Sequence, residues 1–374
     1  MRVAIVTESF LPQVNGVTNS VLQVLRHLRR EGHDALVLAP GDPPRRVHGA
    51  RVVALRSIPL PGYTQFRLGV PTARAIAREL EAFAPDVVHL ASPFTTGNPA
   101  VRAAGRLDLP VVAVYQTDIA GFAQRYGFPG AADATWRWVR SIHDHADRTL
   151  APSTIAATDL AEHGVDRVHL WRRGVDTAAF SPRHRDARWR RRLAPRGEVL
   201  VGFVGRLAAE KQIEDLRGVD ALDGVRVVVV GAGPEEAALR GALPRASFLG
   251  QLTGPALSRA VASLDIAVQT GPYETFCQSA QEAMASGVPV VAVGAGGVAE
   301  LVEPSRTGWL YPPGDLDALT ARVADLAGDA AKRRAMGRAA QEAVRSRTWP
   351  VVCEQLMDHY VAAITRRRAG SVRV

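Results

Sequence analysis

The sequence predicts an α/β protein built from two Rossmann-like halves, each with a parallel sheet covered by helices. Short, fully apolar runs, typical of strands buried on both faces, alternate with segments of helical periodicity. This alternation runs once along the chain, stops at residues 177–198 and then starts again. The length of 374 residues fits two to three domains. Repeated strand–helix alternation of this kind indicates layered α/β domains.

The first series of elements opens the chain. Residues 3–7 form a continuous apolar run, and a loop containing Pro12 and Gly16 follows it. Apolar residues then recur at helical spacing up to Gly32, which we expect to end the helix. Further strands of this half are expected at residues 35–39, 87–90, 111–115, 149–151 and 168–171.

An arginine-rich segment separates the two series. Seven arginines lie between Arg183 and Arg196, and prolines flank the run. Strands of the second half are expected at residues 199–204, 225–230, 248–249, 265–269 and 289–293. The chain from residue 316 onward is expected to be helical, and its last helix, 351–364, is long enough to cross a domain junction. We therefore predict domains at residues 1–183 and 184–350, followed by a helical segment at 351–374.

Composition excludes several classes of protein. The formal net charge is +9, yet the chain contains no recognised nucleic-acid-binding module. Its two cysteines, Cys277 and Cys353, cannot build a disulfide framework or a zinc ribbon, so we expect no metal site and a reducing, cytoplasmic setting. The longest uncharged stretch, 283–299, contains Pro289 and four glycines and is better explained by strands and turns than by a membrane span.

The loop at Asn15 and Gly16 is a candidate ligand site in the first half. Ligands of doubly wound sheets bind at the carboxyl ends of the strands, and this loop follows the first strand. Glycine permits close approach of the backbone, and the amino end of the next helix favours an anion. An ordinary strand-to-helix turn explains the loop equally well.

Two cations stand at the equivalent position of the second half. Arg206 and Lys211 follow the strand 199–204, and we expect a helix to start there. Lys211 is one of only two lysines in an arginine-rich chain. A pair of cations beside a helix amino end suits a diphosphate, although a solvated basic surface is the alternative.

Two carboxylates, Glu274 and Glu282, are eight residues apart, just over two helical turns. We therefore expect both to face one crevice. A carboxylate accepts hydrogen bonds from a sugar diol such as a ribose, and backbone N–H groups at residues 276–278 can hold phosphate oxygens.

Together these residues resemble a known family. The run 205–211 reads Gly-Arg-Leu-Ala-Ala-Glu-Lys, Glu274 and Glu282 have the Glu-x7-Glu spacing, and the runs 287–290 and 296–300 read Gly-Val-Pro-Val and Gly-Gly-Val-Ala-Glu. The set resembles retaining, nucleotide-sugar-dependent glycosyltransferases of the GT-B fold, family four. The runs 7–17, 115–118 and 171–176 are most similar to actinobacterial GDP-mannose-dependent α-mannosyltransferases of glycolipid synthesis. The resemblance covers residues 2 to about 320.

The resemblance implies a GT-B fold, in which two Rossmann-like domains face a central cleft and a C-terminal helix crosses back. The first domain would bind the acceptor and the second the nucleotide-sugar donor. The implied roles are charge neutralisation of the donor diphosphate by Arg206 and Lys211, ribose binding by Glu282, and contact with the donor sugar by Glu274, Phe276, Cys277 and Gln278. Gly16 would close over the phosphates.

Two positions depart from the family pattern. Many relatives have glycine where this chain has Cys277, which places a side chain near the sugar site. Many also have histidine at Gln116, so Asp118 becomes the nearest titratable group and joins Arg206, Lys211 and Glu274 as a catalytic candidate. Three further residues are candidates for binding the acceptor: Asn15, Tyr115 and Gln116.

The function expected is retaining transfer of mannose from GDP-mannose to an acceptor hydroxyl, with no metal or other cofactor and no covalent nucleophile. The expected acceptor is a glycolipid or another glycoconjugate. Alternatives are a UDP-sugar donor acting on a polysaccharide or secondary metabolite, a sugar-nucleotide epimerase or phosphorylase of the same architecture, and a nucleotide- or nucleic-acid-binding protein. Residues 199–365 carry 15 basic and 19 acidic groups, so the basic surplus lies outside the donor half. This favours a cytoplasmic protein in peripheral contact with anionic lipid on the inner face of the plasma membrane.

Overall fold

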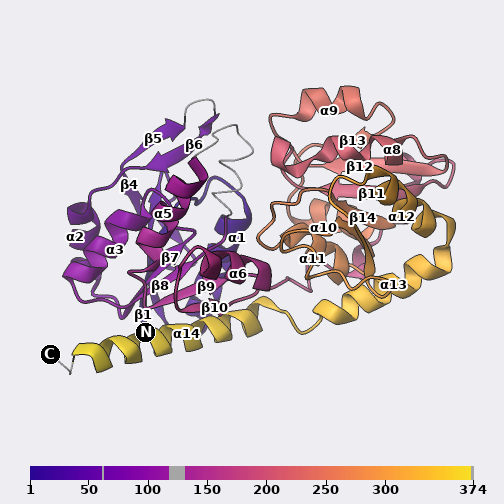
Figure 1. The fold of residues 1–374 in the computed structure, drawn as a ribbon. Helices are drawn as coiled ribbons and strands as arrows, with labels where there is room; N and C mark the ends of the chain where they lie inside the picture. The colour runs from indigo at the N-terminus through magenta and orange to yellow at the C-terminus, as the bar shows by residue number, and fades with distance from the viewer. Residues whose placement is uncertain (61–62, 118–130, 372–374) are drawn as a thin grey trace. The chain divides into compact units, whose positions relative to one another are not determined.

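The computed structural model describes residues 1–60, 63–117 and 131–371. The chain divides into two compact units; Figure 1 colours the chain by residue number, so unit 1 contains both the indigo N-terminal part and the yellow C-terminal helix. Unit 1 comprises Met1–Arg173 and Pro350–Val374, and unit 2 comprises Gly174–Trp349. Residues 174–183 belong to unit 2 by their contacts, whereas the sequence suggested a boundary at residue 183. The reason is that the Val175 N–H donates to the carbonyl of Arg347 at 2.8 Å, and Val175 pairs with Thr348 as an isolated parallel bridge.

Unit 1 has, among its described residues, an eight-stranded sheet in the order β10-β9-β8-β7-β1-β2-β4-β3. All neighbours are parallel except the β3–β4 pair. The strands are β1 (Arg2–Thr7), β2 (Asp34–Pro40), β3 (Arg46–Val47), β4 (Ala50–Leu55), β7 (Val87–Ala91), β8 (Val111–Val114), β9 (Arg148–Ala151) and β10 (Val168–Leu170). The helices are α1 (Gly16–Arg30), α2 (Ala73–Phe83), α3 (Gly97–Arg106), α5 (Ala131–His143) and α6 (Thr154–Glu162). A separate hairpin pairs β5 (Ser57–Leu60) with β6 (Tyr63–Gly69).

Unit 2, every residue of which is described, has a six-stranded parallel sheet in the order β13-β12-β11-β14-β15-β16. Its strands are β11 (Val199–Val204), β12 (Val225–Val230), β13 (Ser247–Phe248), β14 (Ile266–Gln269), β15 (Val290–Val293) and β16 (Gly308–Tyr311). The helices are α7 (Ala187–Leu193), α8 (Arg217–Asp220), α9 (Glu236–Ala242), α10 (Gly254–Ala262), α11 (Gln278–Ala285), α12 (Leu316–Gly328) and α13 (Ala330–Val344). The prediction of two Rossmann-like parallel sheets is therefore confirmed.

The last helix, α14 (Trp349–Ser371), packs on unit 1 from Pro350 onward (Figure 1). The indole Nε1 of Trp171 donates to the carbonyl of Val352 at 2.8 Å, and the hydroxyl of Tyr360 lies 2.6 Å from Nδ1 of His89 on β7. Burial lowers the pKa of His89 to about 3, so this imidazole is neutral. Three large side chains, Trp171, His89 and Tyr360, thus join the helix to the core of unit 1.

The arginine-rich segment has a structural role. Arg185 and Arg190 donate to the two carboxylate oxygens of Asp265 at 2.7 and 2.8 Å, and the same carboxylate accepts the N–H of Leu200. Burial would raise the pKa of Asp265, but these hydrogen bonds and charges lower it overall. Two of the seven arginines therefore bind Asp265 near the start of β11 and are not available to bind a polyanion such as nucleic acid.

No helix among residues 1–60, 63–117 and 131–371 combines the length and the apolar character needed to cross a bilayer.

Candidate active site

Arg206 and Lys211 follow β11 at the carboxyl edge of the unit 2 sheet. The α-helix expected to start there begins only at Arg217, with α8. Instead the chain forms two 3-10 turns, η2 (Ala209–Lys211) and η3 (Ile213–Leu216), joined at Gln212. Gln212 adopts a left-handed conformation with φ of 49°, which interrupts regular helix. The segment that holds Arg206 and Lys211 therefore does not start an α-helix beside them.

Each of these two cations is paired with a carboxylate. A guanidinium N–H of Arg206 donates to Glu210, which is 3% exposed, and the ammonium of Lys211 donates to Glu274. Burial alone would lower the pKa of Lys211, but the charge and hydrogen bond of Glu274 raise it. Lys211 is therefore fully protonated at neutral pH. A diphosphate bound at this edge of the sheet would meet two cations whose positions are already fixed by carboxylates.

The loop after β14 brings the candidate sugar-site residues together. Phe276 and Cys277 are buried at 5% and 4% exposure, and Cys277 caps α11 with a left-handed φ of 75°. Burial, with the nearby charge of Glu274, raises the pKa of the Cys277 thiol to about 12. The thiol is thus protonated and cannot serve as a nucleophile at neutral pH. Gln278 donates from Nε2 to the carbonyl of Gly174 at 3.1 Å.

Glu282 stands on the second turn of α11. Burial raises the pKa of its carboxyl group to about 8; a hydrogen bond from Gln278 opposes the shift and the charge of Asp176 adds to it. Glu282 is therefore largely protonated at neutral pH. Glu274 contacts Lys211, whereas Glu282 contacts Gln278, so the two carboxylates have different partners.

The glycine pair at residues 296–297 supports this loop. The Gly297 N–H donates to the carbonyl of Glu274 at 2.6 Å. A Cβ atom added at Gly297 would lie 2.3 Å from the carbonyl oxygen of Thr275, closer than any side chain tolerates. The glycine therefore lets two loops pack backbone to backbone and fixes the position of Glu274.

In unit 1, the loop after β1 is held by a polar network. Asn15 caps α1: its Oδ1 accepts the N–H of Thr18 at 3.0 Å and its Nδ2 donates to the hydroxyl of Ser9 at 2.7 Å. Gly16 is exposed, and a Cβ added there would meet no described atom within 4 Å. Arg173 donates to the carbonyl of Gly16 at 3.3 Å. The side chain of Asn15 and the guanidinium of Arg173 thus hold the loop, while the space beside the Gly16 Cα stays open.

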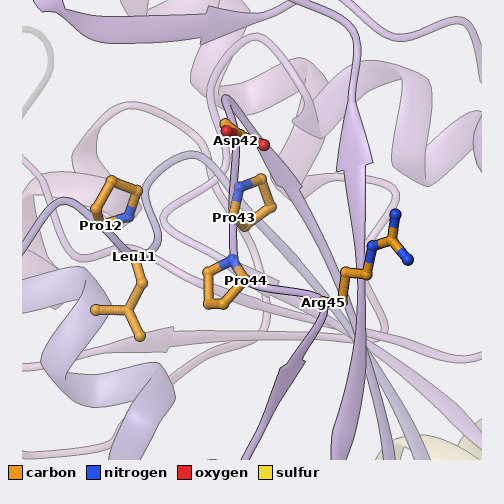
Figure 2. A pocket seen from close by; sticks show the side chains of 6 residues that line it. All are labelled: Leu11, Pro12, Asp42, Pro43, Pro44 and Arg45. Carbon is orange, nitrogen blue, oxygen red and sulfur yellow. The ribbon is translucent and has the colours of Figure 1, made fainter.

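A pocket of about 540 Å³ adjoins this loop. It is lined by Leu11, Pro12, Asp42, Pro43, Pro44 and Arg45. Figure 2 shows the rings of Pro43 and Pro44 between Leu11–Pro12 and Arg45. The pocket lies where the loops after β1 and β2 meet, because these two strands are parallel neighbours.

The remaining sequence candidates differ in their surroundings. Tyr115 is buried and stacks on Trp136 with ring centroids 6.2 Å apart, and Gln116 is 7% exposed. Asp118 lies outside the described residues.

Two buried carboxylates were not predicted from the sequence. Glu210 was not selected as the partner of Arg206, although the i, i+4 spacing of the two could have indicated the pair. The other is Glu8, whose buried carboxylate accepts the N–H groups of Phe94 and Thr96.

Comparison with known proteins adds independent evidence. Residues 14–179 match the family model described as Glycosyltransferase Family 4, and residues 186–343 match Glycosyl transferases group 1. A protein of Mycolicibacterium smegmatis named GDP-mannose-dependent alpha-mannosyltransferase is 52% identical over 98% of this chain and 99% of its own length. The chain belongs to glycosyltransferase family 4. A Corynebacterium glutamicum protein of the same name is 43% identical to this glycosyltransferase over 98% of the chain and 91% of the relative.

The GT-B fold of this family 4 glycosyltransferase is confirmed by solved structures. The crystal structure of Anabaena Alr3699/HepE in complex with UDP superposes with a TM-score of 0.81 and covers 97% of this chain and 100% of the Anabaena chain. The sequence identity is 19%, so this likeness concerns the fold. The expectation that the chain is a sugar-transferring enzyme is confirmed by the family.

Proposed function

We propose that this glycosyltransferase moves mannose from GDP-mannose to an acceptor hydroxyl with retention of the anomeric configuration. The names of the relatives that are 52% and 43% identical support the donor. The observation that carries the proposal is the pair of carboxylate-held cations, Arg206 and Lys211, at the carboxyl edge of the unit 2 sheet. Negative charge builds on the diphosphate as the anomeric bond breaks, and preorganised cations at this edge stabilise it.

The residue roles proposed here are those that the family resemblance implies, and the surroundings of several side chains support them. Arg206 and Lys211 neutralise the leaving diphosphate, without a metal or other cofactor. Glu282 accepts the ribose hydroxyls, and Glu274, held by Lys211, faces the donor sugar with Phe276, Cys277 and Gln278. The protonated Cys277 thiol supports a same-face attack in which the leaving phosphate takes the acceptor proton. Asp118 remains a catalytic candidate, and Asn15, Tyr115 and Gln116 remain candidates on the acceptor side.

The first test uses the two lysines of the chain. Lys211→Ala should lower kcat by about 10²–10³, the scale for loss of one preorganised charge-stabilising contact. Lys332→Ala is the matched control, since Lys332 pairs with Asp325 away from the site and should keep wild-type turnover. A Lys211→Ala enzyme with the kcat of wild type would refute the role of this cation. NMR of the product anomer tests retention.

A donor panel tests the sugar and base. Binding of GDP-mannose but not of UDP-sugars, measured by ligand-induced melting shift, is expected. Preference for a UDP-sugar would favour the alternative donor. Conversion of GDP-mannose alone into an epimer, without an acceptor, would favour an epimerase instead.

The acceptor is proposed to be lipid-linked and reached by a cytoplasmic enzyme at an anionic membrane surface. The basic surplus outside residues 199–365 supports this, and the burial of both free cysteines suits a reducing compartment. Binding to vesicles that contain phosphatidylglycerol should exceed binding to phosphatidylcholine vesicles and weaken with salt. Equal binding to both vesicles at every salt concentration would refute the membrane contact. Nucleic acid is not proposed as a partner, because Arg185 and Arg190 are held by Asp265.

A further inference from the structure

Ser92, which directly follows β7, has a strained backbone. Its φ is 53°, in the left-handed region that costs a residue with a side chain about 1–2 kcal/mol. Within the described parts of unit 1, Ser92 is the one buried residue other than glycine with this conformation. Such a conformation persists only where the surrounding structure holds it, and it is common at functional sites. The contacts of Ser92 show what holds it and what it holds.

Ser92 contacts the segment at the end of β8 at two points. Its N–H donates to the carbonyl of Val114 at 3.0 Å, which continues the pairing of β7 with β8. Its Oγ lies 2.8 Å from Oγ1 of Thr117, a hydrogen-bond distance between two hydroxyl groups. Tyr115 and Gln116, both buried, lie between these two contacts in the chain. One residue thus clamps this segment at both of its ends.

Glu8, which directly follows β1, anchors the chain on the other side of Ser92. Its carboxylate accepts the N–H groups of Phe94 and Thr96 at 2.8 and 2.6 Å. It also accepts the hydroxyls of Thr95 and Thr96 at 3.1 and 2.6 Å. A carboxylate that is 7% exposed is costly unless it is hydrogen-bonded, and these four bonds offset that cost. The loop after β7 is therefore fixed to the end of β1, which restricts the movement of Ser92.

The three strands involved end at one edge of the unit 1 sheet. β8, β7 and β1 are parallel neighbours in this order, and ligands of such sheets bind at the carboxyl ends of the strands. We propose that Ser92 is a positioning residue for transfer to the acceptor, because its N–H and hydroxyl hold Tyr115 and Gln116 in place. This inference rests on the proposed function, in which Tyr115 and Gln116 are candidates on the acceptor side. Reacting groups must be aligned closely, since a misplacement of about 1 Å can cost roughly a hundredfold in rate.

The experiment breaks the contact between the two hydroxyls from each side. Ser92→Ala removes one hydroxyl, Thr117→Val removes the other with little change of shape, and Thr117→Ser keeps it. Thr365→Val is the matched control, because Thr365 is an exposed residue of α14 whose hydroxyl donates to the carbonyl of Val361. The acceptor probe is octyl α-D-glucopyranoside, with GDP-mannose as donor.

Ser92→Ala and Thr117→Val should each lower kcat/KM for the glucoside about threefold to tenfold, the effect of one hydrogen bond, and leave KM for GDP-mannose unchanged. The double variant should lose no more than either single variant, because both remove the same contact. Thr117→Ser and Thr365→Val should have the kcat/KM of wild type.

Hydrogen–deuterium exchange of the free proteins gives a second measurement, which needs no acceptor. The amides of residues 115–117 should exchange about threefold to tenfold faster in Ser92→Ala and Thr117→Val than in wild type, because the segment opens more easily. The amides of β11, in unit 2, should exchange at the wild-type rate.

Faster exchange together with the loss in kcat/KM supports the proposal. Exchange at the wild-type rate overturns it, and so does faster exchange in a variant that keeps the kcat/KM of wild type. Melting curves show whether each variant is folded, and Thr117→Val carries the test if Ser92→Ala does not fold, because Thr117 is half-buried. If wild type makes no mannosyl product, the proposed function fails with this probe, and the exchange rates alone decide whether Ser92 clamps the segment.

Discussion

Replacement of Glu282 by glutamine tests the electrostatics of the proposed donor site. Burial raises the pKa of Glu282 from its ordinary 4.5 to about 8. The folded protein therefore holds a proton that the unfolded chain releases, and its stability falls as the pH rises from 4.5 to about 8. Each pKa unit corresponds to about 1.36 kcal/mol. Between pH 5 and pH 8 the loss of unfolding free energy has an upper limit of about 4 kcal/mol. Because the side chain of Glu282 is partly open to solvent, we expect a loss of about 2–4 kcal/mol.

Glu282→Gln keeps the shape of the side chain and cannot ionise. The variant should therefore match wild type at pH 5 and exceed its stability at pH 8. At about 2–4 °C per kcal/mol for a unit of this size, the difference in melting temperature at pH 8 should reach several degrees. Melting curves of wild type, Glu282→Gln and the exposed control Glu342→Gln at both pH values provide the measurement. If the difference between Glu282→Gln and wild type is the same at pH 5 and pH 8, the reasoning is wrong.

The same variant reports on donor binding. Ribose hydroxyls donate their protons, and an ionised carboxylate accepts them more strongly than a protonated carboxyl group, which keeps only part of its acceptor capacity. GDP should thus bind wild type more tightly as the pH rises from 6 toward 9, and Glu282→Gln should bind it weakly with no such trend. A wild-type Kd that is constant across this range would argue against ribose binding by Glu282.

Further predictions concern the stability of each unit. Gly231→Ala should lower the stability of unit 2 by about 2–4 kcal/mol in urea unfolding, because the added Cβ would lie 1.8 Å from the Gly205 carbonyl oxygen and φ is 148°. Tyr360→Phe should lower the melting temperature of unit 1 through loss of one buried hydrogen bond to His89, about 1–2 kcal/mol; an unchanged melting temperature would contradict that contact. Asp265→Asn should lower the free energy of unfolding of unit 2 at neutral pH, measured in urea. The difference in that free energy between the variant and wild type should become smaller as the pH falls through the lowered pKa of Asp265.

The apolar runs of the sequence were sufficient to predict most of both sheets. Residues 3–7 and 199–204 became β1 and β11 because a strand buried on both faces needs uninterrupted apolar side chains. Strand β16 was missed, since Gly308–Tyr311 begins with glycine and includes a tryptophan instead of a β-branched run. The turn at Gln212 was also missed, because a left-handed residue other than glycine leaves little trace in sequence.

The candidate site was predictable in its residues more than in their contacts. Arg206 and Lys211 could be chosen because cations at a strand end suit a diphosphate. The partner of Lys211 could not be derived, since Glu274 is 63 residues away and only the neighbouring placement of β11 and β14 brings the two together. Nor could the burial of Arg173 be read from a run of arginines and glycine.

The packing of α14 on unit 1 has a consequence for biosynthesis. The partners His89 and Tyr360 are 271 residues apart, with the whole of unit 2 between them in the chain. A ribosome adding about 5–20 residues per second needs roughly 10–40 seconds to proceed from Arg173 to the end of α14. During this interval the nascent unit 1 lacks the helix that covers Trp171 and His89. Unit 1 therefore leaves the ribosome first but completes its core last. We expect the surface around Trp171 and His89 to need shielding until α14 has been synthesised.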